Sequence, residues 1–330
     1  MHRTTLVIGG TRNLGPDLVA ALRARGDRVT VLNRGITPDD LPAEVERLRA
    51  DRSDAAGLHA ALGGRSFDLV VDTTLYTGAD ARTIARLLEG RTGRYVFWST
   101  GQVYLVRTGL ARPFSEEHYD GALMPEPPLA HPGDHDNWVY GVGKRAAEEV
   151  LREAHRARGF PYVALRMPMI NSARDHYGRL AGYVHRLLDG GPIVIPDDQD
   201  ALILRHVFGG DVVTATLRAA DPGVPAGTCL NISQDETLTL EAMLEPLGAT
   251  FGVAVRLVRL PRAVLESHGL LPACSPWSGL WMSALANERS KVVLGMRYTT
   301  VADYLPPLIG PARRASADLR SRDLELRLAQ

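Results

Sequence analysis

The first half of the chain alternates short apolar runs with amphipathic stretches, and this alternation restricts the fold more than any other feature. The apolar runs are continuous, which is typical of strands buried on both faces of a parallel sheet. The amphipathic stretches have the spacing of helices that cover such a sheet. Strands are expected at 4–8, 28–32, 45–50, 67–71, 95–99 and 162–167, and helices at 14–24, 54–62, 79–89 and 140–158. The pattern predicts an α/β fold with a doubly wound parallel sheet.

A glycine-rich turn lies between the first expected strand and the first expected helix. In a doubly wound fold this turn holds the pyrophosphate of a dinucleotide, because glycines allow close backbone approach and the helix N-terminus attracts anions. The strict G-x-G-x-x-G pattern is not met, since Arg12 stands at the usual middle glycine. The candidate residues of the turn are Gly9, Gly10, Thr11, Arg12, Asn13, Leu14 and Gly15.

We therefore interpret residues 1–170 as a dinucleotide-binding Rossmann domain. A proline-rich stretch at 105–139 breaks the strand-helix alternation and predicts a long loop, of the kind that often serves as a lid. The remainder, 171–330, is expected to form mainly a smaller mixed α/β substrate lobe, with some segments returning to the Rossmann domain.

The composition of the chain restricts the kinds of partner that we expect it to bind. The formal net charge is zero, which removes the electrostatic reason to expect nucleic acid or a membrane surface. No apolar run is long enough to span a membrane. Cys229 and Cys274 lie far apart, outside any metal-ligand spacing, and fit two buried thiols in a reducing cytoplasm. We expect a cytoplasmic protein that binds a small molecule and no metal.

The end of the second strand bears on the choice of cofactor. An acidic residue there accepts a hydrogen bond from the ribose of NAD, whereas an arginine suits the 2′-phosphate of NADP. This chain has Asn33 and Arg34, and Arg12 lies in the turn. The sequence favours NADP, with NAD as the alternative. Asp51 either contacts the adenine or belongs to the start of the next helix. Arg52 and Thr73 are further candidates for cofactor binding.

Tyr140 and Lys144 form the most informative pair. Residues four apart lie on one face of a helix. An ammonium near a phenol stabilises the phenolate, so such a tyrosine can exchange a proton with a substrate oxygen. The chain has ten tyrosines and only two lysines, so the pair seldom arises by chance. Both residues are candidates for catalysis and for cofactor binding.

A third group should contact the same substrate oxygen. Ser99 and Thr100 end a strand, where hydroxyl groups face the ligand crevice. Successive side chains of a strand point to opposite faces, so only one of the two should reach the site.

These motifs together resemble the extended short-chain dehydrogenase/reductases, the nucleotide-sugar epimerase/dehydratase group. The turn Gly9–Gly15 is similar to the branch with a G-G-T-R-F-[IL]-G sequence. The segment 99–104 resembles S-[ST]-x-x-V-Y, which implies that Thr100 is the catalytic hydroxyl. Leu165-Arg166-Met167-Pro168 is similar to the L-R-P stretch near the nicotinamide, which makes Met167 a cofactor candidate. Asn287–Lys291 resembles a C-terminal element of the family and implies a structural role for Lys291.

Departures from the family pattern matter as well. Gly101 and Gln102 stand where sugar 4,6-dehydratases carry an acidic pair, so that water elimination lacks its acid and base. His131, His135 and Asp136 are expected in the loop before Tyr140, outside any helix, and are not interpreted as a metal site. Candidate substrate contacts are Tyr76, Gln102, His135, Asn171 and Arg205, with Arg186 and His206 also in the variable lobe.

The sequence leaves three functions open. The first is an NAD(P)-dependent carbonyl reductase or alcohol dehydrogenase acting on a hydroxylated substrate, with a nucleotide sugar as one candidate. The second is a nucleotide-sugar epimerase that retains NAD, which would use the same residues. The third is a non-enzymatic dinucleotide- or RNA-binding relative. The resemblance also implies a homodimer formed through two helices.

Overall fold

The computed structural model describes residues 2–199 and 202–330, and the chain divides into two compact units. The first unit comprises Met1–Met167, Gly209–Ile232 and Leu285–Arg297. The second comprises Pro168–Phe208, Ser233–Ala284 and Tyr298–Gln330. The first unit is thus assembled from three separate stretches of sequence.

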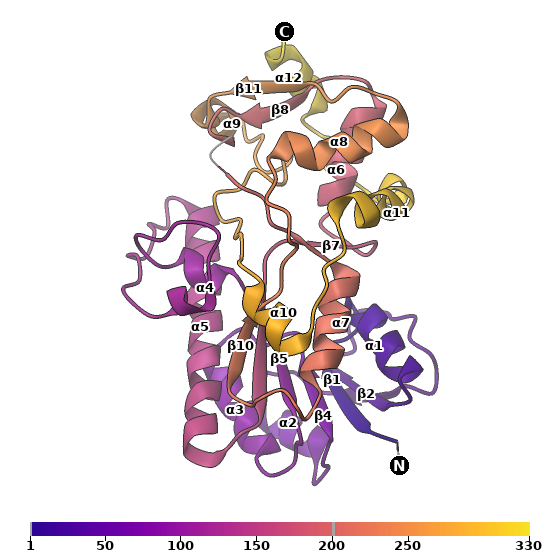
Figure 1. The fold of residues 1–330 in the computed structure, drawn as a ribbon, viewed down its shortest axis with the longest axis vertical. Helices are drawn as coiled ribbons and strands as arrows, with labels where there is room; N and C mark the ends of the chain where they lie inside the picture. Colours follow the sequence, from indigo (N-terminus) through magenta and orange to yellow (C-terminus); the bar gives the residue numbers. More distant parts are fainter. Residues whose placement is uncertain (1, 200–201) are drawn as a thin grey trace. The chain divides into compact units, whose positions relative to one another are not determined.

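The first unit is built on a parallel sheet that, within the described residues, has seven strands (Figure 1). The strands are β1 (Thr4–Ile8), β2 (Arg28–Asn33), β3 (Glu46–Arg49), β4 (Leu69–Asp72), β5 (Tyr95–Thr100), β6 (Tyr162–Met167) and β10 (Thr228–Asn231). Their order is β10-β6-β5-β4-β1-β2-β3, with parallel pairing between neighbours. The predicted doubly wound α/β fold is confirmed.

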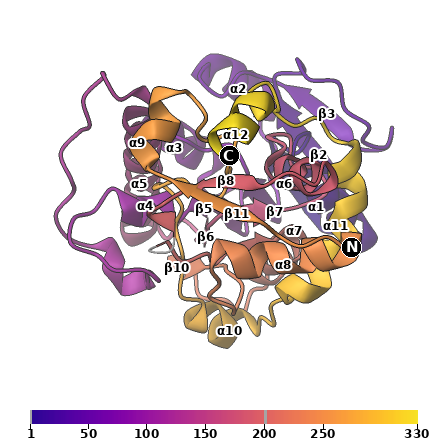
Figure 2. The ribbon, with the colours of Figure 1, turned by 90° about the horizontal axis from the view of Figure 1, so that it is seen from above.

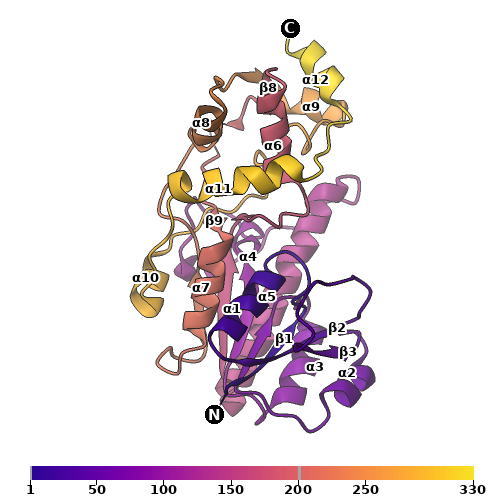
Figure 3. The same cartoon turned by 90° about the vertical axis from the view of Figure 1, so that its right-hand side faces the viewer.

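Helices cover both faces of this sheet. On one face α1 (Gly15–Ala24) packs on α7 (Gly209–Ala219), and on the other α3 (Gly78–Leu88) packs on α5 (Pro132–Arg158) (Figure 3). The remaining helices of this unit are α2 (Ala55–Leu62), α4 (Gln102–Leu105), the 3-10 helix η1 (Glu116–Tyr119) and α10 (Glu288–Leu294).

The core beneath α3 and α5 explains why these segments fold as they do. Ile84 of α3 and Leu151 of α5 are fully buried against Tyr95 and Phe97 of β5. Burial of each such aliphatic side chain contributes about 1.5–3 kcal/mol.

The strand order changes direction at β1 and β4, which lie side by side. The connection after β1 leads to β2 on one side, whereas β4 continues toward β5 on the other. Loops that follow the carboxyl ends of two such strands diverge and leave a crevice for ligand. In this chain those loops begin with Gly9 and Thr73.

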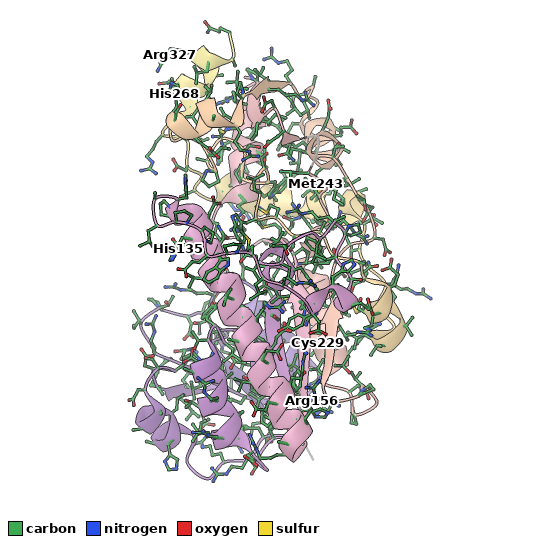
Figure 4. All side chains as sticks on the ribbon, turned by 90° about the vertical axis from the view of Figure 1, so that its left-hand side faces the viewer. His135, Arg156, Cys229, Met243, His268 and Arg327 are labelled. Carbon is green, nitrogen blue, oxygen red and sulfur yellow. The ribbon has the colours of Figure 1, made fainter. Side chains whose placement is uncertain are left out.

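The stretch 105–139, predicted to be a long loop, is partly helical. It contains η1, and α5 begins at Pro132, so residues 132–139 belong to the helix that carries Tyr140. The prediction that His135 and Asp136 lie outside any helix was therefore wrong. Proline is well suited to the first turn of a helix, where its missing N–H is not needed. Figure 4 shows His135 near one end of α5 and Arg156 near the other.

Two glycines bring α5 close to its neighbours. A Cβ atom at Gly141 would lie 2.6 Å from Cγ1 of Val106, and one at Gly143 would lie 2.6 Å from the carbonyl oxygen of Tyr76. Both positions are on the turn between Tyr140 and Lys144. The start of the predicted catalytic helix is therefore pressed against the loop after β4.

The second unit has its own core, in which α6, α8 and α11 pack together around the buried Trp277. Strands β8 and β11 lie side by side and parallel (Figure 2), as do β7 and β9. Among the described residues its elements are β7 (Ile170–Asn171), α6 (Arg179–Leu188), β8 (Ile193–Pro196), β9 (Val207–Phe208), α8 (Leu240–Phe251), β11 (Leu257–Leu260), α9 (Arg262–Ser267), α11 (Val301–Arg314) and α12 (Arg322–Leu328).

In the part of the chain that the structure describes, no helix combines the length and apolar character needed to cross a membrane. The same residues contain no cluster of three or more side chains suited to holding a metal ion. Both cysteines are free, but only Cys274 is fully buried, whereas Cys229 on the edge strand β10 is partly exposed.

The close approach at Gly143 predicts a stability difference between two glycines of α5. Gly143→Ala should lower the free energy of unfolding by about 1–3 kcal/mol, because the added methyl group overlaps the Tyr76 carbonyl. Gly133→Ala is the matched control, since nothing lies within 4 Å of its added Cβ. Chemical unfolding of both variants measures the difference, and equal stabilities would contradict the close packing.

Candidate active site

The glycine turn adopts backbone angles that are accessible mainly to glycine. Gly9 and Gly10 have φ values of +96° and +80°, which residues with a Cβ rarely adopt. A Cβ at Gly9 would overlap Oγ1 of Thr73, and one at Gly15 would overlap the backbone of Gly10. Thr73 in turn donates a hydrogen bond from Oγ1 to the carbonyl oxygen of Ile8 at 3.0 Å. The turn, the loop after β4 and the start of α1 therefore lie against one another.

This cradle fits a dinucleotide. The N-cap of α1 is Leu14, whose side chain makes no capping hydrogen bond with the N–H groups of the first turn. Helix N-termini attract phosphate groups through such N–H groups and through the helix dipole. Asn13 has a φ of +50°, and Arg12 and Asn13 are exposed beside the turn.

The end of β2 is rich in arginine and amide groups. Oδ1 of Asn33 accepts hydrogen bonds from the backbone N–H of Gly35, at 2.8 Å, and from Arg49. Arg34 lies 3.8 Å from the carboxylate of Asp51, and both side chains are about half exposed or more, so this pair contributes little to stability. Asp51 also accepts hydrogen bonds from Ser53, which lower the pKa of its carboxyl group.

Arg52 is held inside the protein by Asp72, the last residue of β4. Its two terminal nitrogens contact the two carboxylate oxygens at 2.9 and 2.6 Å, and the Asp72 carboxylate is completely buried. Tyr95 donates a further hydrogen bond to Asp72 at 2.6 Å. Asp72 thereby holds the guanidinium that the sequence predicted to contact the cofactor.

Lys144 and Tyr140 lie together on α5 beside β5. The Lys144 ammonium donates to the carbonyl oxygen of Trp98 at 2.8 Å and lies 5.8 Å from the ring centre of Tyr140. It also lies 4.8 Å from the ring centres of Tyr76 and Phe97. Only 2% of Lys144 is exposed, and this burial lowers the pKa of its ammonium group to about 7. Tyr140 is partly exposed, so its phenol remains within reach of a ligand.

Ser99 and Thr100 have different surroundings, as the alternation of side chains along a strand predicts. Ser99 is buried and donates a hydrogen bond to Glu148 at 2.5 Å. Glu148 is bound on its other side by the buried Arg166, with contacts of 2.5–3.2 Å. Thr100 is partly exposed, and its Oγ1 accepts a hydrogen bond from the backbone N–H of Gln102 at 3.3 Å.

A chain of amide groups extends from Thr100 toward the start of α5. Gln102 donates from Nε2 to Oδ1 of Asn137 at 2.6 Å, and Asn137 donates from Nδ2 to the carbonyl oxygen of Gly133 at 2.7 Å. These bonds orient Gln102 so that its Oε1 atom is buried without a hydrogen-bond partner among the described residues. Asn137 was not among the predicted site residues, because the stretch before Tyr140 was expected to be a loop and its helical spacing from Tyr140 emerges only with α5.

The other predicted contacts of the first unit are placed as follows. Met167 is buried at the end of β6, directly opposite Thr100 in the β5–β6 register. Tyr76 is 47% exposed, and its ring centre lies 6.1 Å from that of Tyr140. His135 contacts Glu126 at 2.9 Å.

Asn171 and Arg205 belong to the second unit. Asn171 is buried and donates to the phenol oxygen of Tyr304 at 3.0 Å. Arg205 is buried and donates to the carbonyl oxygen of Gln234 at 3.0 Å. His206 is buried too, and burial lowers the pKa of its imidazole to about 3. Arg186 is fully buried in an ion pair with Glu325, so it stabilises the packing of α6 and α12 rather than lining a pocket.

Curated proteins with similar sequences include a reductase and a stem-loop binding protein. The 2'-dehydrokanamycin reductase of Streptomyces kanamyceticus is 26% identical over 281 residues, which are 82% of this chain and 74% of that protein. The chloroplast stem-loop binding protein of 41 kDa b of Arabidopsis thaliana is 26% identical over 267 residues, which are 76% of this chain and 64% of that protein.

Solved structures share the fold along nearly the whole chain. The UDP-glucose 4-epimerase of Thermotoga maritima, solved with UDP-glucose, superposes with a TM-score of 0.71 at 20% identity, covering 94% of this chain and 99% of that one. The dTDP-glucose 4,6-dehydratase of Bacillus anthracis, solved with NAD, gives 0.71 at 14% identity, covering 99% and 100%.

The family described as the NAD dependent epimerase/dehydratase family matches residues 5–233. This range contains the glycine turn, the end of β5 and the Tyr140–Lys144 pair. It also covers more than half of the sequence, so the chain belongs to the NAD-dependent epimerase/dehydratase family.

Proposed function

We propose that this chain is an NADP(H)-dependent carbonyl reductase or alcohol dehydrogenase acting on a hydroxylated small molecule. The observation that carries the proposal is the Tyr140–Lys144 pair, in which a buried ammonium lies beside a partly exposed phenol. Family membership supports a nicotinamide dinucleotide as cofactor, and the cradle at Gly9, Gly10 and Gly15 fits one.

The bound dinucleotide would supply the hydride chemistry, and the residues of the chain would handle the proton. Tyr140 would donate its phenolic proton to the substrate oxygen during reduction and remove it during oxidation. Thr100 would donate a hydrogen bond to the same oxygen, because its own Oγ1 already accepts from the N–H of Gln102. Lys144 would stabilise the phenolate form of Tyr140 and hold the nicotinamide ribose.

The substrate would present a hydrogen-bond donor next to the reacting carbon. Oε1 of Gln102 is a buried acceptor without a partner among the described residues, and leaving such an atom unsatisfied costs about 1–3 kcal/mol. A substrate hydroxyl group would satisfy it. The names of the reductase and of the UDP-glucose epimerase agree with polar substrates of this kind.

The first experiment identifies the cofactor and the reaction together. The purified protein is denatured and any released nucleotide is identified by mass, and the protein is then assayed for NADPH oxidation with a panel of keto sugars and nucleotide keto sugars. Empty protein that reduces a panel member supports the reductase. Tightly retained NAD with interconversion of sugar epimers and no net oxidation of NADPH would instead establish the epimerase.

Tyr140→Phe should lower the turnover number for the best panel substrate by about 10²–10⁴-fold, because the proton donor is lost. NADPH binding, measured by fluorescence titration, should stay the same within about twofold, since the aromatic ring remains. Tyr177→Phe, at a tyrosine that is 65% exposed in the second unit, is the matched control. Full turnover in Tyr140→Phe would contradict the mechanism.

Arg34→Glu should weaken NADPH binding by about ten- to a hundredfold and leave NADH binding nearly unchanged. A charge-assisted contact to the 2′-phosphate contributes about 1.5–3 kcal/mol, and NADH lacks that phosphate. Arg28→Glu is the control, because Arg28 is exposed at the opposite end of β2. Equal losses for NADPH and NADH would show that Arg34 does not read the 2′-phosphate.

Gln102→Leu should lower kcat/KM for the best hydroxylated substrate by about three- to tenfold, the contribution of one neutral hydrogen bond. The analogue that lacks the hydroxyl group next to the reacting carbon should react equally well with both proteins. A loss of the same size for both substrates would show that Gln102 has only a structural role.

A further inference from the structure

Lys144 is a buried cation that lacks a carboxylate in direct contact. Among the described residues, its ammonium donates a hydrogen bond to the neutral carbonyl oxygen of Trp98, and the rings of Tyr76 and Phe97 flank it. A buried ammonium is costly unless a negative charge compensates it. The protonation state of Lys144 therefore depends on charges that lie beyond its immediate neighbours.

Asp72 is the charge that the sheet places on the same face. Asp72 lies directly opposite Phe97 in the β4–β5 register, and the Lys144 ammonium lies over the Phe97 ring. Tyr95 precedes Phe97 by two residues, so its side chain shares that face, and its phenol donates to Asp72. The face also carries α5, from which Lys144 comes.

Arg52 opposes the charge of Asp72 through a direct ion pair. Its guanidinium binds both carboxylate oxygens, and its side chain is only 14% exposed. Charges act over longer distances in the protein interior than in water, so both members of the pair act on Lys144.

We propose that the buried Arg52–Asp72 ion pair sets the protonation state of Lys144, with Asp72 favouring the ammonium form and Arg52 opposing it. In this proposal both residues act only through their charges on Lys144, so both are positioning residues for that lysine. In the proposed function, this balance of charges sets the pH range over which the Tyr140–Lys144 pair works. The effect of the Arg52–Asp72 ion pair on Lys144 exists whether or not the chain is a reductase.

The electrostatics of the surrounding groups agree with this arrangement. Burial lowers the pKa of Lys144 to about 7, whereas Asp72 raises it, Arg52 lowers it and Glu148 raises it. Glu148 is largely neutralised by Arg166. Among the described residues, the rings of two further titratable side chains lie near the ammonium, with the centre of Tyr76 at 4.8 Å and that of Tyr140 at 5.8 Å.

The composition of the chain allows a direct test, because Lys144 and Lys291 are its only lysines. Full-length protein labelled with ¹³C at the lysine Cε atoms should give two resonances, and Lys291→Arg identifies the one that belongs to Lys144. Following that resonance from pH 5 to pH 10 gives the titration midpoint of Lys144 without substrate or cofactor. We expect a midpoint near pH 7 in the unmodified protein.

The two partners should move this midpoint in opposite directions. Asp72→Asn should lower it and Arg52→Gln should raise it, each by about one pH unit or more. The double variant Asp72→Asn/Arg52→Gln removes both charges and should return the midpoint close to that of the unmodified protein. Glu89→Gln makes the same charge change as Asp72→Asn in the exposed pair with Arg158 and should have no effect.

Opposite shifts that cancel in the double variant would support the proposal, since loss of packing alone does not reverse sign. Shifts in the same direction, or no shifts, would overturn it. If one single variant fails to fold, the other single variant and the double variant decide together. A shift in the folded single variant that the double variant reverses supports the proposal, and no shift or no reversal overturns it. A missing NADPH oxidation activity would count against the reductase and leave this titration result unaffected.

Discussion

The burial of the Lys144 ammonium is the interaction on which the rest of the site depends. Lys144 is only 2% exposed, so α5 must pack closely enough on the first unit to exclude water from its side chain. Gly141 and Gly143 allow that approach, because a Cβ at either position would overlap a neighbouring segment. The same approach brings the phenol of Tyr140 to the loop that follows β4 and to the ring of Tyr76.

A second buried network holds the middle of α5 in place. Glu148, one turn beyond Lys144, binds Arg166 of β6 and accepts a hydrogen bond from Ser99 of β5. Arg166 also donates to the phenol oxygen of Tyr104 at 2.7 Å, and Tyr104 donates to Asn231 of β10 at 2.8 Å. Removing one partner from such a network leaves a buried charge and is strongly destabilising. The network fixes the rotation of α5 and therefore the faces that Tyr140 and Lys144 present.

The residues that follow β5 bear on the kind of reaction that the site can support. Gly101 and Gln102 replace the acidic pair that the resemblance associates with dehydration, and Gln102 is tied by Asn137 to the start of α5. An amide in that orientation offers a neutral acceptor, which can bind a hydroxyl group but cannot remove a proton as a carboxylate does. This agrees with the proposed oxidation and reduction at carbon.

Local patterns in the sequence determined the parallel sheet, the glycine turn and the Tyr140–Lys144 pair. They did so because strand periodicity, positive φ and helical spacing are properties of neighbouring residues. The start of α5 at Pro132 was missed, because a proline-rich, polar stretch looks like a loop until tertiary contacts select the helix. The tertiary structure alone decided that Arg52 binds Asp72 and that Gln102 binds Asn137. Those pairs are 20 and 35 residues apart, and only the folding of the sheet and α5 brings them together.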